Sequence, residues 1–480
     1  MLNWITGTPG AAQAVVVFLF GTILAAAANY FVDRFGWTSR YRSPWRRFPD
    51  GAVGPKRRWT ARIPVVGWLE TARLRLGKAE NVAKNEKTAR KRGGKSGDGA
   101  TAFDFATIPG WESRFFWARP LVVEAFFAAL LTWRFCVLTD GVATEAEAGR
   151  ALVFWGAETV LYWLALCMTL VDFDDYIIPD AAVIPGAVVG LTLAAVFPFL
   201  TVAPVAWPLD LTGAATTNDV FLFAAFCGES WGLGSSLGVV RGLVFAGIAA
   251  IWTFWSFALL ERRFPARRLG VRKAAAVFCR RLRRSPLTPI LAAVWAFGLI
   301  GIAVVVWKDA SAATFAEIEP TGNAFLGRTA FDRALSSSGA LANAAFGLFV
   351  GATIIWAVRI IGRSALGVEA MGFGDVAALG VIGAFIGWQG AVVAFFVAPF
   401  FGLVFGFLRR FSDKTPEIPY GPFLCGGAVL YLARREQFDA YLAPFFGDPL
   451  FLAGLAVVGF ALLWALLAAL RRAKSWARQG

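Results

Sequence analysis

Two aspartates at the edges of long apolar segments are the side chains best suited to chemistry in this sequence. Asp375 follows Gly372 and Gly374, and the segments around this turn are strongly apolar. Asp172 ends another apolar run and begins an acidic turn that leads to Pro179. A carboxylate at the end of a membrane span is costly to desolvate, so each aspartate is a candidate functional residue. Two carboxylates brought together cannot both ionise easily, and such a pair could act as an acid and a base.

Each aspartate also has a purely structural explanation. Asp375 could cap a helix that starts at Val376, and glycines without a Cβ allow the turn before it unusual dihedral angles. Asp172 could be one of several solvated acids in its turn. The structural explanation is favoured for either aspartate alone. Together, two acids on separate spans that end at one membrane face favour general acid–base chemistry, in which neither role can be assigned to one residue.

The composition identifies a membrane protein. The chain has 480 residues, of which 58% are hydrophobic and 16% charged, and its mean hydropathy is +0.60. These values are too apolar for an ordinary soluble domain. We therefore predict an all-α polytopic membrane bundle of about 9–11 transmembrane helices. The apolar windows are 11–31, 119–139, 151–171, 181–204, 237–260, 287–307, 341–362, 374–389, 390–409, 419–434 and 448–470.

Several classes of catalytic and metal site are excluded by residue usage. The chain contains no histidine, which removes Ser-His-Asp and Cys-His catalysis and every histidine-based metal site. Its 5 cysteines are scattered without a C-x-x-C pair, so a zinc site or a disulfide framework is not expected. We predict no cofactor and no metal, and carboxylates lead the short list of acid–base groups that remain.

The positive charge predicts the orientation in the membrane. The net charge is +15, and much of the excess lies in a basic loop over 32–118. With the N-terminus outside, this loop and most other basic segments fall in the cytoplasm, as the positive-inside rule requires. Asp172 and Asp375 then share the cytoplasmic face. The basic loop is expected to contact anionic lipid headgroups, and no nucleic-acid recognition motif accompanies it.

The same pattern divides the chain into six regions. The first span covers 1–31, and the basic loop 32–118 contains a stretch, 78–102, with the composition of a disordered linker. Membrane cores are expected over 119–260, with Asp172, and over 341–447, with the glycine-flanked aspartate. Residues 261–340 are interpreted as an insertion with one extra span. Residues 448–480 form a last span and a basic tail.

Several segments together resemble the type IV prepilin peptidases, which are bacterial membrane aspartic proteases with a GxGD signature. The stretch Glu369–Gly380 resembles their second active-site signature, and Asp172 stands at the first aspartate of their pattern D-x-D-x(4)-P-D. The segment Ile418–Leu424 resembles a third family segment. Similarity to the family's N-terminal region is found at Asn29 and Arg34, at Arg62–Trp68 and at Arg119–Glu124.

The resemblance implies an aspartic endopeptidase of the bacterial inner membrane, with its active site facing the cytoplasm. Its substrates would be prepilins or pseudopilins, whose basic leader it removes, and its catalytic residues would be Asp172 and Asp375. The residues of supporting motifs would be Gly372, Gly374, Glu369, Asp174, Asp175, Pro179 and Asp180. Four of these acids, Asp174, Asp175, Asp180 and Glu369, could attract the positive charges of the leader, or could be ordinary solvated acids.

The sequence departs from the family pattern in three ways. It lacks the family's zinc-binding cysteine pairs, which weighs against zinc and against N-methylation of the new pilin N-terminus. Alanine, at Ala377 or Ala378, replaces a lysine that usually follows the signature. The two aspartates also lie much farther apart in the chain than in the family. Two alternatives stay open, a transporter that uses both aspartates for proton or cation coupling, and an inactive peptidase-like assembly component. The oligomeric state also stays open.

Overall fold

The computed structural model is predominantly helical in the residues that it describes. These are 10–38, 40–47, 59–76, 108–113, 115–142, 144–197, 237–260, 276–277, 280, 288–308, 337–367, 371–409, 419–446 and 449–476. No strand forms within them, which confirms the predicted all-α class. Among the described helices, 7 are long and apolar enough to cross a membrane, and three shorter apolar helices accompany them. The fold is therefore that of a polytopic membrane bundle.

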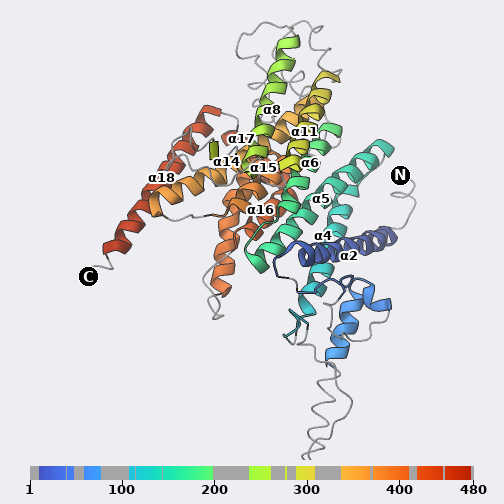
Figure 1. Cartoon of the computed structure of the whole chain (residues 1–480). Helices are drawn as coiled ribbons and strands as arrows, with labels where there is room; N and C mark the ends of the chain where they lie inside the picture. Colours follow the sequence, from blue (N-terminus) through green and yellow to red (C-terminus); the bar gives the residue numbers. More distant parts are fainter. Residues whose placement is uncertain are drawn as a thin grey trace, which may run out of the picture. The chain divides into compact units, whose positions relative to one another are not determined.

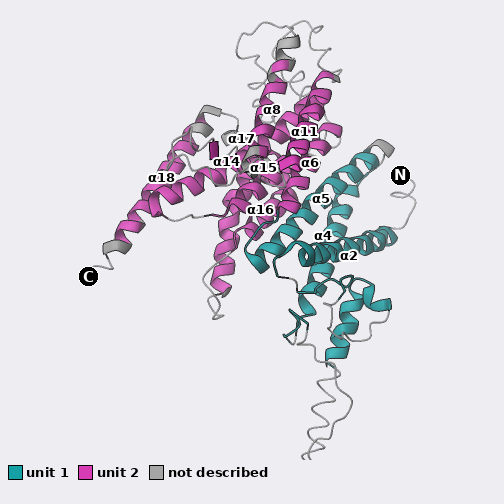
Figure 2. Cartoon of the chain, in the orientation of Figure 1, with its two compact units in different colours: residues 1–179 teal, residues 180–480 magenta. Residues whose placement is uncertain are grey.

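The chain forms two compact units, Met1–Pro179 and Asp180–Gly480 (Figure 2). The boundary lies inside the region 119–260 that the sequence suggested as one membrane core. Asp172 belongs to the first unit and Asp375 to the second.

Three long helices build the first unit: α2 (Gly10–Phe35), α4 (Ala118–Thr139) and α5 (Glu145–Asp175) (Figure 1). Helices α2 and α4 cross closely, because a Cβ on Gly21 would lie 2.7 Å from Ala128 Cα. Helix α5 packs on both. Its Trp163 donates an indole hydrogen bond of 2.9 Å to the carbonyl of Leu24 in α2.

Both ends of α5 are defined by local chemistry. Thr144 and Glu147 form a capping box, in which each side chain accepts from the other residue's backbone N–H. At the other end Tyr176 adopts the left-handed conformation with φ 55° and donates its N–H to the carbonyl of Asp172. Tyr176 therefore ends the helix that carries Asp172.

The described part of the basic loop is ordered around aromatic side chains. It contains the short 3₁₀ helix η1 (Trp59–Arg62) and a helix over 66–76. Trp68, Trp111 and Phe116 are buried together, and the rings of Trp111 and Phe116 stack with centroids 4.3 Å apart. The predicted linker 78–102 lies outside the described residues.

The second unit contains the remaining helices. They are α6 (Asp180–Val196), α8 (Leu237–Leu260), α11 (Thr288–Lys308), α14 (Ser337–Leu366), α15 (Phe373–Arg409), α16 (Gly421–Ala433), α17 (Arg435–Phe446) and α18 (Pro449–Trp476). Glycines allow α14 and α15 to pack at backbone contact. A Cβ on Gly351 would lie 2.3 Å from the carbonyl oxygen of Leu379, and one on Gly347 would lie 2.1 Å from that of Gly383. Any larger residue at these two positions would force the helices apart.

Helix α15 reverses direction at Gly387. This residue has φ 77° and ψ 175° inside an otherwise helical stretch, a conformation that is essentially limited to glycine. A Cβ on Gly383 would lie 3.3 Å from the Cβ of Ala391, whereas residues eight apart in a straight helix are about 12 Å apart. The chain therefore doubles back, and the two segments correspond to the predicted windows 374–389 and 390–409.

The extra span of the predicted insertion 261–340 packs beside α8. Trp252 of α8 donates a 3.0 Å hydrogen bond to the carbonyl of Trp295 in α11, and Trp295 donates one of 3.1 Å to the hydroxyl of Thr253. Helix α6 meanwhile contacts both α14 and α15. Helix α11 therefore packs on α8, while α6 packs on α14 and α15. The interpretation of 261–340 as an insertion stays a prediction.

Candidate active site

Asp375 lies in the first turn of α15, with its side chain 8% exposed. Its carboxylate accepts a 3.2 Å hydrogen bond from the backbone N–H of Gly372, the residue before the helix. The sequence suggested that Asp375 caps a helix that begins at Val376. In the structure the helix begins at Phe373, so Asp375 is its third residue and bonds the residue just before the helix. An acid in a first turn is also favoured by the helix dipole. The carboxylate is buried, fixed in direction and bonded at one oxygen.

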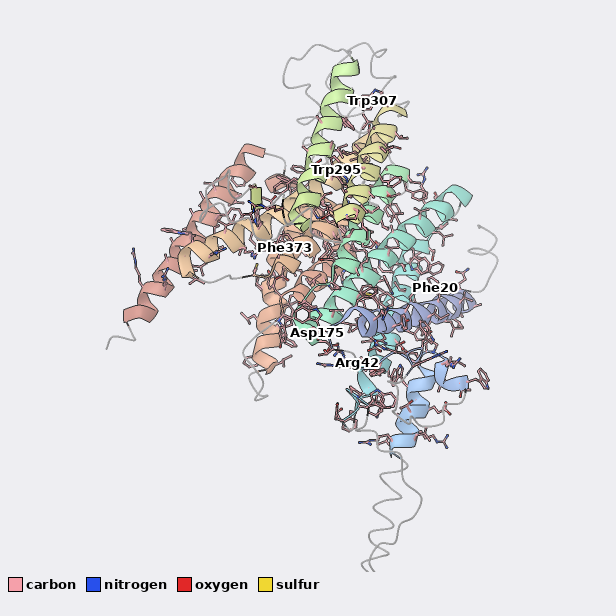
Figure 3. The ribbon with its side chains drawn as sticks, in the orientation of Figure 1. Phe20, Arg42, Asp175, Trp295, Trp307 and Phe373 are labelled. Carbon is pink, nitrogen blue, oxygen red and sulfur yellow. The ribbon has the colours of Figure 1, made fainter. Side chains whose placement is uncertain are left out.

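Two arginines contact the segments on either side of this turn. The Arg359 guanidinium lies over the ring of Phe373, 5.7 Å from its centroid (Figure 3). Arg471 of α18 donates a 3.3 Å hydrogen bond to the carbonyl of Ala365 at the end of α14. Glu369, which the sequence placed in the motif, lies outside the described residues.

Tyr420 is a site residue to which the sequence assigned no role. It directly precedes α16 and donates a 3.4 Å hydrogen bond to the carbonyl of Phe395. It lies close enough to Asp375 for the charge of that carboxylate to act on its phenol. The sequence feature that could have identified Tyr420 is its place in the segment Ile418–Leu424, which resembles a third segment of the family. The structure thus brings the second and third motifs together within one compact unit.

Asp172 lies in the last turns of α5 and is 5% exposed. Of the residues after it, Pro179 is buried and Asp180 is exposed in the first turn of α6. The pairing of Asp172 with Asp375 stays a prediction, because the two belong to different compact units.

Asp174 and Asp175 are both engaged by other parts of the first unit. The carboxylate of Asp174 forms ion pairs with Arg40, Arg42 and Arg119. Asp175 accepts hydrogen bonds from the segment 37–38, just after α2 (Figure 3). These acids are therefore built into the fold, which the sequence did not indicate.

Glu124 connects the three segments that resembled the family's N-terminal region. Its fully buried carboxylate accepts hydrogen bonds from the side chains of Asn29 (3.2 Å) and Trp68 (3.0 Å) and from the backbone N–H of Val65 (2.6 Å). Val65 has a positive φ of 63°, which places its N–H toward the carboxylate. A carboxylate inside an apolar helix was a sufficient signal for such a role.

Glu158 is another buried carboxylate of the first unit, and the sequence reasoning did not single it out. Arg134 of α4 and Glu158 of α5 form a bidentate pair with N–O distances of 2.7 and 2.6 Å, and both side chains are buried. Charged residues inside spans are expected to pair in this way. The pair joins two helices and lies far along α5 from Asp172.

Potential metal ligands do not gather in the described part of the chain. No three side chains of His, Cys, Asp or Glu lie together there in a way that could hold an ion. Its cysteines Cys136, Cys167 and Cys425 are not joined in disulfides. The sequence-based expectation of no metal and no cofactor stays a prediction.

The comparisons with known proteins converge on one family. Residues 323–407 match the model of the type IV leader peptidase family, a segment that contains α14, Asp375 and most of α15. A prepilin leader peptidase/N-methyltransferase of Aeromonas salmonicida strain A449 is 31% identical over 87 residues, 18% of this chain and 30% of the relative. The protein of the same name from Pseudomonas aeruginosa PAO1 is 31% identical over 111 residues, 22% of this chain and 38% of the relative.

The similarity is confined to part of each protein. The chain spans about a third of the length of the curated relatives that it matches, and no solved structure matches it. Asp172 and the N-terminal segments lie outside the matched family segment. The resemblance recognised from the motifs is nevertheless confirmed for residues 323–407, which match the type IV leader peptidase family.

Proposed function

We propose that this protein is a membrane aspartic endopeptidase that removes the basic leader from prepilins or pseudopilins at the cytoplasmic face. The observation that carries the proposal is the buried carboxylate of Asp375, fixed at the start of α15 inside the segment matched to the family. The relatives are named as prepilin leader peptidases, which supports the substrate class. Their second named activity, N-methylation, is not proposed for this chain, which lacks C-x-x-C pairs.

The proposed chemistry needs two carboxylates that share a proton. The ionised aspartate takes a proton from water as the water attacks the scissile carbonyl, and the protonated aspartate donates to the carbonyl oxygen. The newly protonated aspartate then gives its proton to the leaving amine as the C–N bond breaks, and the ionised aspartate takes a hydroxyl proton back from the tetrahedral intermediate, which restores the pair. Asp172 is the proposed partner, because it is buried at a helix end and matches the first family aspartate.

The connectivity of the chain supports this pairing. Only residues 176–179 separate the end of α5 from the start of α6. Within the second unit α6 packs on α15, and a Cβ on Gly190 would lie 2.9 Å from the ring of Phe385. Both residues lie ten positions beyond an acid, Asp180 and Asp375. If both helices run outward from the cytoplasm, as the charge pattern predicts, their acidic ends lie at the same level.

The position of Asp375 favours a peptidase over a transporter. A coupling carboxylate is expected near the bilayer midplane, whereas Asp375 lies in the first turn of its helix. Asp180 is exposed in the first turn of α6, and its negative charge is proposed to attract a basic leader. The basic loop is proposed to contact anionic lipid.

The test compares Asp172→Asn and Asp375→Asn with Asp140→Asn, which removes an exposed acid at the end of α4. Each purified protein is incubated in detergent with a peptide that contains a basic leader, a glycine and an apolar helix, and products are identified by mass. Loss of one acid–base group should lower kcat by about 10²–10⁴-fold in the first two variants only. Full cleavage by both would reject the two-aspartate mechanism, and no cleavage by the unmodified protein would favour an inactive component.

A further inference from the structure

Asp174 is surrounded by three arginines from two other segments. Arg40 and Arg42 follow α2, and Arg119 lies in the first turn of α4. Their terminal nitrogens lie 3.2, 2.5 and 2.5 Å from the carboxylate oxygens of Asp174, whose side chain is 4% exposed. Charge-assisted bonds of this kind are the strong class of protein hydrogen bonds. These ion pairs hold the end of α5 to the segment that follows α2 and to the first turn of α4.

Asp175 makes a parallel set of contacts with the residues after α2. It accepts hydrogen bonds from the backbone N–H groups of Trp37 (2.6 Å) and Thr38 (3.3 Å) and from the Thr38 hydroxyl. The approach is close enough to need a glycine, because a Cβ on Gly36 would lie 2.9 Å from the Asp175 carboxylate. Two consecutive acids thus hold the last turn of α5 against one loop.

Arg119 brackets the proposed catalytic residue. One of its terminal nitrogens bonds Asp174, and the other donates a 3.3 Å hydrogen bond to the carbonyl of Leu170. Asp172 lies midway between these two residues in the same helix. The guanidinium therefore holds the backbone carbonyl of Leu170 before Asp172 and the side chain of Asp174 after it.

The local charge argues against recognition of a basic leader by Asp174. Three guanidinium groups face this single carboxylate, and burial together with repulsion from Arg119 and Arg40 lowers the pKa of Arg42 to about 10. Nearby Asp33 is buried and accepts from the Ser43 N–H, and Arg46 lies within its electrostatic reach. Asp175 is occupied by the loop. An added lysine would meet positive charge at Asp174.

We propose that Asp174 and Asp175 are positioning residues, which hold Asp172 in its reactive place by clamping the end of α5, and that they do not read the charge of the leader. This inference rests on the proposed function. It replaces the sequence-based idea that all four acids could attract the leader. Because a displacement of about 1 Å can lower the rate by about 10²-fold, the clamp would act on kcat.

The test crosses enzyme variants with substrate variants. Asp174→Asn keeps the shape of the side chain and removes its charge, and it is assayed with a leader that carries lysines and with one that carries glutamines instead. The clamp predicts a fall in kcat of about 10-fold to 10²-fold with both leaders and a KM within about 2-fold of the unmodified enzyme. A rise in KM with the lysine leader alone, or an unchanged kcat with both leaders, would overturn it.

Milder variants keep the inference testable if Asp174→Asn does not fold. Arg119→Gln should lower kcat more than Arg40→Gln, because Arg119 also holds Leu170, whereas Arg40 makes a single, longer contact. Thr38→Val removes one hydroxyl contact with Asp175. Equal kcat in both arginine variants would contradict the bracketing of Asp172.

Hydrogen exchange separates failure of the clamp from failure of the proposed function. The amide of Tyr176 donates to the Asp172 carbonyl, and the amide of Trp37 donates to Asp175. In Arg119→Gln the Tyr176 amide should exchange at least about 10-fold faster, while amides in α14 keep their rates. Unchanged exchange at Tyr176 would refute the clamp even if the unmodified protein cleaved no leader at all.

Discussion

The buried pair Arg134–Glu158 gives the sharpest test of how the first unit is held together. Its two nitrogen–oxygen contacts are 2.7 and 2.6 Å, and the side chains are 7% and 9% exposed. The Tyr162 hydroxyl adds a longer contact of 3.5 Å to Glu158. The perturbation compares Arg134→Met, Glu158→Leu and the double variant, because these apolar residues have similar length.

The expected effects follow from what each variant leaves behind. Either single substitution leaves one charge buried in a membrane span without its partner. Breaking a buried pair costs about 3–5 kcal/mol, and a lone charge at mid-span costs about 2.5–3.5 kcal/mol on insertion scales. We therefore expect each single variant to lose about 3 kcal/mol of unfolding free energy, about two powers of ten in the equilibrium constant. The double variant should lose at most about 1 kcal/mol, because apolar replacement of a whole pair is often neutral.

Cys167 provides the assay. Its thiol lies on α5 and is fully buried, so a thiol reagent should label it only when the first unit opens. The variants are titrated with denaturing detergent in mixed micelles, and labelling of the Cys167 peptide is followed by mass. The sum of the two single losses in unfolding free energy should exceed the loss in the double variant by about 5 kcal/mol. This coupling energy compares with about 0.6 kcal/mol for an average hydrogen bond between membrane helices. Additive effects, or single variants within about 1 kcal/mol of the unmodified protein, would refute the reasoning.

Two further predictions concern single residues. Glu124→Ala should lower unfolding stability by more than about 3 kcal/mol, since it leaves three buried donors unpaired, and Glu124→Gln, which keeps one acceptor oxygen, should lower it by less. Labelling of Cys167 measures both, and equal effects would contradict the assigned contacts. Gly387→Ala should lower the unfolding free energy by about 1–3 kcal/mol, because the dihedral angles of Gly387 suit glycine alone. The control Gly459→Ala in α18, where the added Cβ has open space around it, should leave stability unchanged. Both are measured by the same titration, followed by labelling of buried Cys425.

Hydropathy and charge predicted the helical elements because both act locally. A run of apolar residues must form helices in a bilayer whatever its neighbours are, so each predicted window overlaps a described helix. Helix α17 had no predicted window. The sequence predicted the two segments of α15 as separate apolar windows, but it did not show what reverses the chain between them. Gly387 has no sequence signal of its own, since its left-handed conformation depends on the packing of Ala391 against Gly383.

The contacts around the candidate site could not be predicted, because they join residues distant in sequence. Asp174 and Arg42 are both visible in the sequence, but their pairing depends on how the chain returns from α2 to the end of α5. The sequence analysis weighed Asp174 as a surface charge that could meet a leader. In the structure the Asp174 carboxylate is buried among three arginines, whereas Asp180 is exposed at the start of α6.

A physical rule distinguishes the acids of the described spans from one another. Glu124 accepts three hydrogen bonds, Glu158 faces a guanidinium, and Asp174 faces three. Such saturation removes the cost of burial, and it also removes the ability to exchange a proton with a substrate. Asp375 differs, because one backbone N–H bonds one of its oxygens and no arginine pairs with it among the described residues. A carboxylate with so few partners keeps its capacity for acid–base chemistry, which is the physical reason to seek catalysis at Asp375 and structure at Glu124, Glu158 and Asp174.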